Sequence, residues 1–328
     1  MSKKRIIPRL NWEISEIGYG MWGIGGGEGG WKGNDDDESM LALQRAIDKG
    51  CNFFDTAWIY GRGHSEKIMG EVLRNNINKK LYVASKIPPK NRIWPSSREM
   101  KIEDVFPDDH IHEYIEKSLE NLGTSSIDIM QFHVWEDSWW KNDSWKKIML
   151  DYKQQGIIRA IGISINRWEP WNVLETLKTD LIDTVQVCYN IFDQSPDDEL
   201  IPYCEKNGIG IIARVPFDEG ILSGAISRDT KFDQDDWRSS YFVEENLLPS
   251  MDKVDEIKKL VPFGYTLAQL ALKFILSNPQ ITTVIPGMRK IRHVDLNFET
   301  PNLPELNVEL INKLKLFRWD RTPTTWSQ

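Results

Sequence analysis

Cysteine and histidine are scarce in this chain of 328 residues, and their scarcity argues against several kinds of site. The three cysteines are Cys51, Cys188 and Cys204, and no two of them have a CxxC spacing. Neither a disulfide framework nor a cysteine-based zinc site is therefore expected. Of the five histidines, only His133 ends a predicted strand. A metal-dependent hydrolase needs several such ligands, so we expect no bound metal.

An excess of positive charge is also missing. The chain has 49 acidic and 41 basic residues, a formal net charge of -8, which argues against a general affinity for nucleic acid or anionic lipid. It lacks any apolar run of about 18 residues, and its first residues, MSKKRIIPRLNW, lack the apolar core of a signal peptide. These features predict a cytoplasmic protein that acts without a membrane or nucleic-acid partner.

Short β-rich runs alternate with longer amphipathic stretches along the whole chain. The eight predicted strands are residues 14–19, 52–55, 81–85, 127–133, 160–164, 184–187, 209–213 and 282–285. Helical periodicity is found at 37–49, 65–74, 110–121, 145–155, 168–177, 197–206, 267–277 and 290–297, with extra helices near the C-terminus at 251–260 and 306–317. This alternation predicts an α/β fold, a (β/α)8 TIM barrel. No change in composition divides the chain, so we expect a single domain over residues 1–328.

Two of the predicted βα connections, residues 87–109 and 215–240, are long. Structureless segments of that length inside a compact domain are usually lids or binding loops. Both follow a strand, so we expect both at the rim of the barrel where active sites lie.

Ionisable residues stand where three successive predicted strands end. Asp55 ends the second strand, Lys86 follows the third and His133 ends the fourth, while Tyr60 lies in the loop after Asp55. Each of these residues alone is more often a solvated or structural group. Chance is a poor explanation for four ionisable groups that converge on one barrel mouth. Together, the four groups can perform a specific reaction.

That chemistry is proton donation by a phenol. A tyrosine has an ordinary pKa near 10, which a neighbouring ammonium lowers by favouring the phenolate. Lys86 is expected to supply the ammonium, and Asp55 its counter-charge. His133 can then hydrogen-bond the oxygen that Tyr60 protonates. The four residues therefore predict a general acid for the conversion of a carbonyl to an alcohol.

Three motifs resemble the aldo-keto reductase superfamily. They are GCNFFDTAWIYGRGHSEKIMGEVL at residues 50–73, VASK at 83–86 and QFH at 131–133. The resemblance implies a (β/α)8 barrel that uses NAD(P)H, with Asp55, Tyr60, Lys86 and His133 as its catalytic tetrad. In the loop after Asp55, glycines permit a sharp turn, and Ser65 is the expected N-cap of the next helix.

The same resemblance implies which residues hold the cofactor. GISIN at residues 162–166 and VQVCYN at 185–190 are similar to family motifs, although Ile165 is an extra residue in the first. Arg214 stands where the family commonly has an aromatic residue; its planar guanidinium can stack on a ring, and its charge is expected to disfavour NADP+. The expected cofactor contacts are Gly20, Met21, Trp22, Asp55, Ser164, Asn166, Gln186, Arg214, Pro216, Phe217, Gly220, Leu222, Gly224, Gly287, Arg289, His293 and Asn297.

Basic residues crowd the start of the last predicted barrel helix, in IPGMRKIRHVDLNF at residues 285–298. They are Arg289, Lys290, Arg292 and His293. Backbone N–H groups and the helix dipole already favour an anion there. A ribose 2'-phosphate fits this position, so NADPH is predicted rather than NADH.

Tryptophan is abundant, with 14 residues. Eight lie in predicted βα connections: Trp22, Trp31, Trp58, Trp94, Trp135, Trp139, Trp140 and Trp237. Trp22, Trp58 and Trp135 adjoin motif residues, so we expect them to contact a small-molecule carbonyl substrate together with Tyr60 and His133. Such a mouth suits aromatic or aliphatic aldehydes, or the faces of a sugar.

Two other interpretations compete with a barrel reductase. GYGMWG at residues 18–23 has the GxGxxG spacing of a dinucleotide-binding fold, but a glycine-rich run follows it instead of a helix. Some barrels that resemble this family are non-catalytic NADP(H)-binding regulatory subunits. All four tetrad positions are occupied, which favours catalysis.

Overall fold

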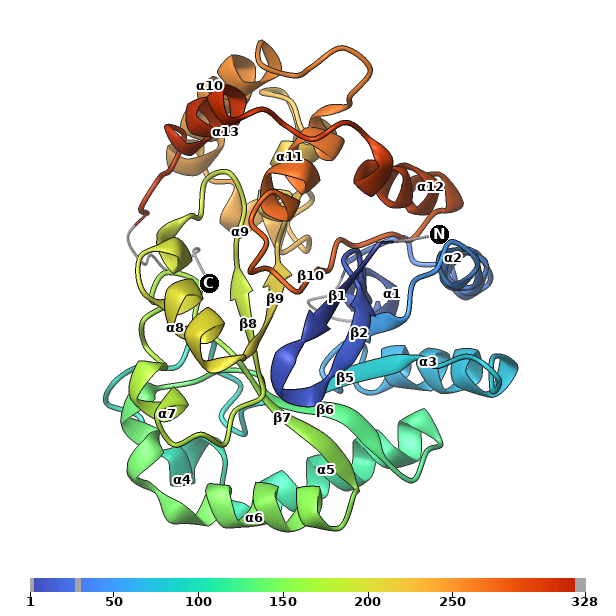
Figure 1. Ribbon diagram of the computed structural model, residues 1–328, viewed down its shortest axis with the longest axis vertical. Coiled ribbons are helices and arrows are strands. Elements are labelled where there is room, and N and C mark those ends of the chain that lie inside the picture. Colours follow the sequence, from blue (N-terminus) through green and yellow to red (C-terminus); the bar gives the residue numbers. More distant parts are fainter. Residues whose placement is uncertain (1–2, 27–30, 322–328) are drawn as a thin grey trace.

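Eight parallel strands form a barrel in the computed structural model, which describes residues 3–26 and 31–321 (Figure 1). Their spatial order follows the chain, and isolated parallel bridges from Ile17 to Val284 and from Gly20 to Gly287 join the first strand region to the last. The strands are β3 (Tyr19–Gly20), β4 (Phe53–Asp55), β5 (Tyr82–Ile87), β6 (Ile127–Phe132), β7 (Ile158–Ser164), β8 (Thr184–Cys188), β9 (Gly210–Arg214) and β10 (Thr283–Val284). The predicted (β/α)8 barrel is confirmed.

Helices surround the barrel on its outer side (Figure 1). The longer ones are α2 (Asp36–Asp48), α3 (His64–Asn75), α5 (Asp108–Leu122), α6 (Asp143–Gln154), α8 (Leu200–Asn207), α10 (Glu244–Lys258), α11 (Leu267–Leu276), α12 (Ile291–Glu299) and α13 (Val308–Lys315). Single-turn helices are α1 (Trp22–Gly25), α4 (Ile102–Val105), α7 (Leu174–Leu177) and α9 (Arg238–Tyr241). The helices α10 and α13 are the predicted extra helices.

The first predicted strand, 14–19, is wrong as a single element. Residues Trp12–Ser15 form β2, which pairs antiparallel with β1 (Lys4–Ile7), and the barrel begins only at β3. The hairpin packs Ile7 and Trp12 against Phe53 and Tyr82, at the starts of two barrel strands. It therefore covers the end of the barrel where strands begin and leaves the carboxyl ends open.

Two helix predictions also need correction. The helix predicted at 168–177 is reduced to α7, and residues 170–173 form a turn. Pro170 disfavours the helical conformation of Glu169, the residue before it. The N-cap of α3 is Gly63, with a φ of 93°, and not Ser65. The hydroxyl of Ser65 instead hydrogen-bonds Thr56 Oγ1 at 2.8 Å and the backbone oxygen of Met21 at 3.3 Å.

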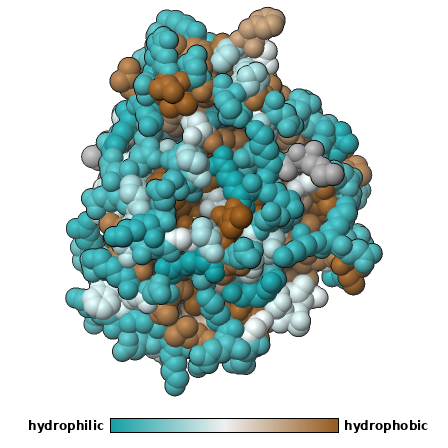
Figure 2. All heavy atoms as spheres, viewed as in Figure 1, coloured by the Kyte–Doolittle hydropathy of each residue, from teal (hydrophilic) through white to brown (hydrophobic). Residues whose placement is uncertain are grey.

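Polar and charged residues cover most of the face drawn in Figure 2, with apolar residues scattered among them. No helix within residues 3–26 and 31–321 combines the length and the hydropathy that crossing a bilayer requires.

Candidate active site

Lys86 is a buried ammonium at the end of β5. Its Nζ lies 2.7 Å from Asp55 Oδ2 and donates hydrogen bonds to the backbone oxygen of Thr56 at 2.8 Å and to Tyr60 Oη at 3.2 Å. Burial lowers the pKa of Lys86, but Asp55 and Tyr60 raise it more, so the net shift is upward. All three N–H donors have an acceptor, and the side chain stays charged.

The carboxylate of Asp55 is held by neighbours on three strands. Its second oxygen accepts hydrogen bonds from Gln186 Nε2 at 2.8 Å, from β8, and from Gln131 Nε2 at 3.4 Å, from β6. Because Lys86 occupies the first oxygen, both oxygens are satisfied and the carboxylate is fixed in position. Gln131 was not predicted; the only sequence signal was its place in QFH, two residues before His133.

Tyr60 is positioned by close packing of backbone on backbone. Gly61 has a φ of 69°, and a Cβ added to it would lie 2.0 Å from the backbone oxygen of Gly25 in α1. A Cβ on Gly25 would lie 2.5 Å from the carbonyl carbon of Tyr60. Glycine is required at both points of contact, which explains the glycine beside the tyrosine in IYGRG.

The pKa of Tyr60 is raised, and its direction corrects a prediction. Burial raises it and Asp55 adds to the rise, while Lys86 and Arg214 lower it. Burial has the larger effect because the ring lies in an enclosed site. Tyr60 is therefore a protonated phenol at neutral pH, and Lys86 limits the rise without reversing it.

His133 faces the same site. Its ring lies edge-on to Tyr60 and to Trp94, with ring centroids 5.8 Å apart in both cases. Burial, with Lys86 and Arg214 nearby, holds the pKa of His133 well below its ordinary value, so the ring is neutral at pH 7. Its buried Nδ1 has no hydrogen-bond partner among the described residues.

A cavity of about 1760 Å³ lies over the carboxyl ends of the strands and receives side chains from both long connections. The structure places most predicted site residues on its wall: Gly20, Trp22, Asp55, Tyr60, His133, Ser164, Asn166, Gln186, Arg214, Pro216, Phe217, Gly220, Gly287, Arg289, His293 and Asn297. Met21, Lys86, Leu222 and Gly224 lie behind this wall or beside it.

The cavity fits a dinucleotide that carries polar groups at both ends. Gln186 Oε1 and Arg214 Nε are buried in its wall and have no hydrogen-bond partner within the described ranges, so they are free to bind a ligand amide or carbonyl. Arg289 and His293 line the cavity where α12 begins. These two groups of residues fit a nicotinamide and a phosphate, respectively.

Asn166 and Arg214 make contacts that the motifs did not predict. The amide nitrogen of Asn166 donates to the backbone oxygen of Ser96 and to Glu136 Oε1, both at 3.3 Å. This side chain therefore ties the strand end to the long 87–109 connection. Arg214 Nη2 donates to the backbone oxygen of the extra residue Ile165 at 3.1 Å.

Two of the predicted substrate residues do not line the cavity. Trp135 is fully buried, packs against Phe132 and Trp145, and donates through Nε1 to Thr176 Oγ1 at 2.8 Å. Trp58 packs edge-on against Tyr114 on α5. Trp58 lies between Asp55 and Tyr60 in the chain, and Trp135 lies two residues after His133, but neither side chain lines the cavity.

The predicted Trp22 lines the cavity, and so do three tryptophans that were not singled out as substrate contacts: Trp31, Trp94 and Trp237. Trp22 lies 4.9 Å from Trp237 and 5.9 Å from Trp31, measured between ring centroids, and Trp94 adjoins His133. Lys32, next to Trp31, forms an ion pair with Asp235. The first βα loop and the long loop after β9 thus meet over the cavity.

A buried cluster of charges beside the cavity was missed by sequence reasoning. Arg167, directly after GISIN, bonds to Asp193, Asp218 and Glu219. The signal was the acid pair in PFDEG, just after β9. In the described part of the chain, no three His, Cys, Asp or Glu side chains are grouped in a way that would hold a metal.

Comparison with known proteins identifies the family and the fold of this chain. A family model described as aldo/keto reductase family matches residues 16–316. Aldo-keto reductase YhdN of Bacillus subtilis is 28% identical over 286 residues, 85% of this chain and 82% of that protein. An NADH-specific methylglyoxal reductase of Escherichia coli is 27% identical, over 88% of this chain and 90% of its own length. The solved structure of a glycerol dehydrogenase from Gluconobacter oxydans is 28% identical, with a TM-score of 0.79 and 98% of both chains covered.

Proposed function

Because the chain belongs to the aldo/keto reductase family, we propose that it is an NADPH-dependent oxidoreductase that reduces an aldehyde or ketone to an alcohol. The observation that carries this proposal is the chain of contacts from Asp55 through Lys86 to Tyr60, with His133 beside the phenol. This set of groups supports proton donation to a carbonyl oxygen at the mouth of a cavity that fits the cofactor.

Reduced nicotinamide, when bound, supplies a hydride to the carbonyl carbon. The chain supplies the proton: Tyr60 Oη protonates the carbonyl oxygen and becomes a phenolate. Lys86 Nζ, 3.2 Å away, stabilises that phenolate, and Asp55 keeps Lys86 charged. Neutral His133 holds the carbonyl oxygen by a hydrogen bond before the proton moves.

Ser164 and Gln186 are proposed to hold the nicotinamide end, and Arg289 and His293 the 2'-phosphate. One relative is named as NADH-specific, so membership of the family does not decide the cofactor. The preference for NADPH rests on Arg289 and His293, both on the cavity wall. Arginine binds phosphate oxygens through several donors at once. NADH has no 2'-phosphate, so it lacks the group that Arg289 would bind.

The proposed substrate is a small carbonyl compound that fits between aromatic side chains. Trp22, Trp94 and Trp237 line the cavity near Tyr60 and His133. Flat aromatic aldehydes and the apolar faces of sugars both pack well on such walls. A panel of nitrobenzaldehyde, methylglyoxal, aldoses and pyridoxal, followed by loss of NADPH absorbance, will define the class.

Tyr60→Phe tests the function directly. The variant keeps the ring and removes the proton donor, so NADPH should still bind, seen as fluorescence quenching. Carbonyl reduction should fall by a factor of about 10² to 10⁴. Unchanged turnover would remove Tyr60 from its role, and a wild type that binds NADPH but reduces no carbonyl would favour a regulatory barrel.

A further inference from the structure

The segment that follows β9 has an unusual backbone. Val215, Asp218 and Glu219 have φ angles of 56°, 44° and 57°, in the left-handed region that non-glycine residues rarely adopt. Val215, Pro216, Phe217, Glu219 and Gly220 all line the cavity. A strained backbone of this kind persists only where the surrounding structure holds it in place.

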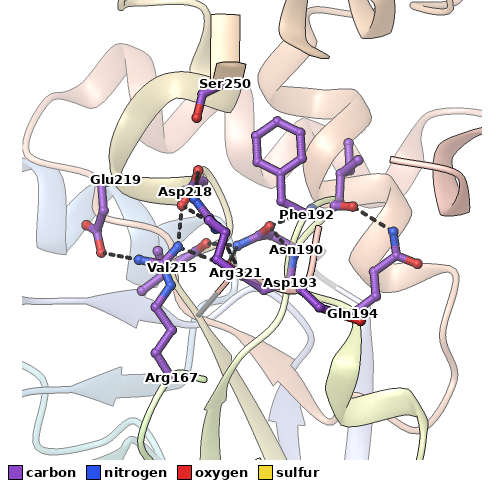
Figure 3. Close-up of polar contacts among 12 residues, drawn as sticks. Arg167, Asn190, Phe192, Asp193, Gln194, Val215, Asp218, Glu219, Ser250 and Arg321 are labelled. Carbon is purple, nitrogen blue, oxygen red and sulfur yellow. Dashed lines mark hydrogen bonds and ion pairs between the residues drawn. The ribbon is translucent and has the colours of Figure 1, made fainter. Parts of the chain in front are cut away.

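Among residues 215–220, Asp218 alone is absent from the cavity wall, and it is fully buried. Figure 3 shows its carboxylate beside Arg321. Its Oδ1 accepts hydrogen bonds from Tyr241 Oη at 2.6 Å, from Arg321 Nη2 at 3.2 Å and from Arg167. Its Oδ2 accepts from Arg321 Nη1 at 3.1 Å. Arg321 therefore donates hydrogen bonds to both carboxylate oxygens of Asp218, which lies in the middle of the strained segment.

Arg321 also reaches the start of the segment by a second route. Its Nη2 lies 2.9 Å from Asp193 Oδ1, and the other oxygen of Asp193 accepts from Asn190 Nδ2 at 2.8 Å. The same Asn190 nitrogen donates to the backbone oxygen of Val215 at 3.0 Å. One guanidinium thus supports the segment at Val215 and at Asp218 (Figure 3).

Arg321 is remote in sequence from every residue that it supports. It follows α13, is only 8% exposed, and lies with its guanidinium carbon 4.7 Å from the ring centre of Trp168 and 4.9 Å from that of Trp319. Arg167 and Arg321 are the two cations that pair with the acidic side chains of Asp193, Asp218 and Glu219. Removal of the Arg321 guanidinium would leave these buried acidic groups paired with Arg167 alone.

We infer that Arg321 is a positioning residue for cofactor binding: it holds the backbone of residues 215–220, with Val215, Asp218 and Glu219 in the left-handed region, in the conformation that forms part of the cavity wall. The inference rests on the proposed function, because it takes the cavity to be the NADP(H) site. Arg321 itself does not line the cavity, so its effect passes through its neighbours. They are Asp218, the Asp193–Asn190 pair, and Tyr241, whose Oη accepts a hydrogen bond from Arg321 Nη1 at 3.0 Å and whose side chain lines the cavity.

The test compares Arg321→Met with a matched control, Arg318→Met. Arg318 lies three residues before Arg321, but it pairs with Asp198 and Asp320 on the surface and has no ion pair or hydrogen bond with residues 215–220 within the described ranges. The dissociation constant for NADPH is measured by fluorescence quenching, and kcat at saturating NADPH. Arg321→Met should raise the dissociation constant and the KM for NADPH by about tenfold or more, while kcat changes by less than about threefold. Arg318→Met should change none of these constants.

Guanidinium rescue separates positioning from a general loss of structure. Guanidinium chloride, well below denaturing concentrations, should restore NADPH affinity to Arg321→Met, and the same concentration of sodium chloride should not. In an Asp218→Asn background, Arg321→Met should cost less affinity than in the wild type, because the two residues act as one unit.

Three results would overturn the inference while leaving the proposed function intact: wild-type NADPH affinity in Arg321→Met, equal losses in both arginine variants, or rescue by sodium chloride. If Arg321→Met does not fold, Asp218→Asn alone carries the test, and unchanged affinity there has the same meaning. A wild type that does not bind NADPH would instead reject the proposed function.

Discussion

The ammonium nitrogen of Lys86 lies 3.2 Å from the phenolic oxygen of Tyr60. The proton affinity of the phenol is therefore set by opposing influences. Burial and Asp55 raise its pKa, while Lys86 and Arg214 lower it, and the net result is a raised pKa. A reductase needs the protonated phenol, and the reverse oxidation needs the phenolate, so the two directions should respond differently to pH.

Carbonyl reduction should be independent of pH between about 6 and 9, because Tyr60, with a pKa above its ordinary value near 10, stays protonated there. Alcohol oxidation should rise with pH over the same range as the phenolate fraction grows. Lys86→Met removes the cation that lowers the pKa of Tyr60, so oxidation should fall more than reduction, each by a factor of about 10² to 10⁴. Both rates are measured as pH profiles at saturating cofactor.

Lys90→Met is the control for this experiment, since Lys90 is an exposed lysine four positions along the chain. Its profiles should match those of the wild type. A wild-type reduction rate that declines as pH rises through 7 would show that another group, with a near-neutral pKa, is the acid.

His133 should act as a neutral hydrogen-bonding group. Its pKa is held well below the ordinary value, so the wild-type profile should show no inflection between about pH 5.5 and 7. His133→Gln keeps a donor but moves it, and should raise the substrate KM and lower kcat, together by about 10- to 100-fold in kcat/KM. The NADPH dissociation constant should stay unchanged. An inflection near pH 6.5 that disappears in the variant would contradict this role.

Sequence patterns were sufficient for the barrel because its strands are continuous apolar runs with polar ends. Asp55, Lys86 and His133 could be placed from those ends alone. Trp135 could not, because the direction in which a loop residue turns depends on tertiary packing, here against Phe132 and Trp145. Arg321 gave no signal either, since nothing local relates it to Asp218, 103 positions away.

Trp135 and Trp94 should separate stability from substrate binding. Trp135→Phe removes the hydrogen bond to Thr176 and part of a buried ring, so it should lower the free energy of unfolding by about 1–3 kcal/mol. Its kcat/KM should stay at the wild-type value. Trp94→Phe alters the cavity wall beside His133 and should change the substrate KM with little effect on unfolding. Denaturant titration and steady-state kinetics on both variants test these expectations. An altered substrate preference in Trp135→Phe would show that Trp135 contributes to substrate binding.

Arg289 should decide between NADPH and NADH. It lies on the cavity wall and is fixed by a hydrogen bond of 2.6 Å from Nη1 to the backbone oxygen of Lys32. A charge-assisted bond to phosphate is worth about 1.5–3 kcal/mol, so Arg289→Met should weaken NADPH binding by about 10- to 100-fold. NADH has no phosphate at that position, and its dissociation constant should change by less than about twofold. Arg228→Met is the control, because Arg228 pairs with Asp252 and Asp255 on the surface and is absent from the cavity wall. Equal losses of NADPH and NADH affinity in Arg289→Met would show that the arginine supports the cavity wall instead of reading the phosphate.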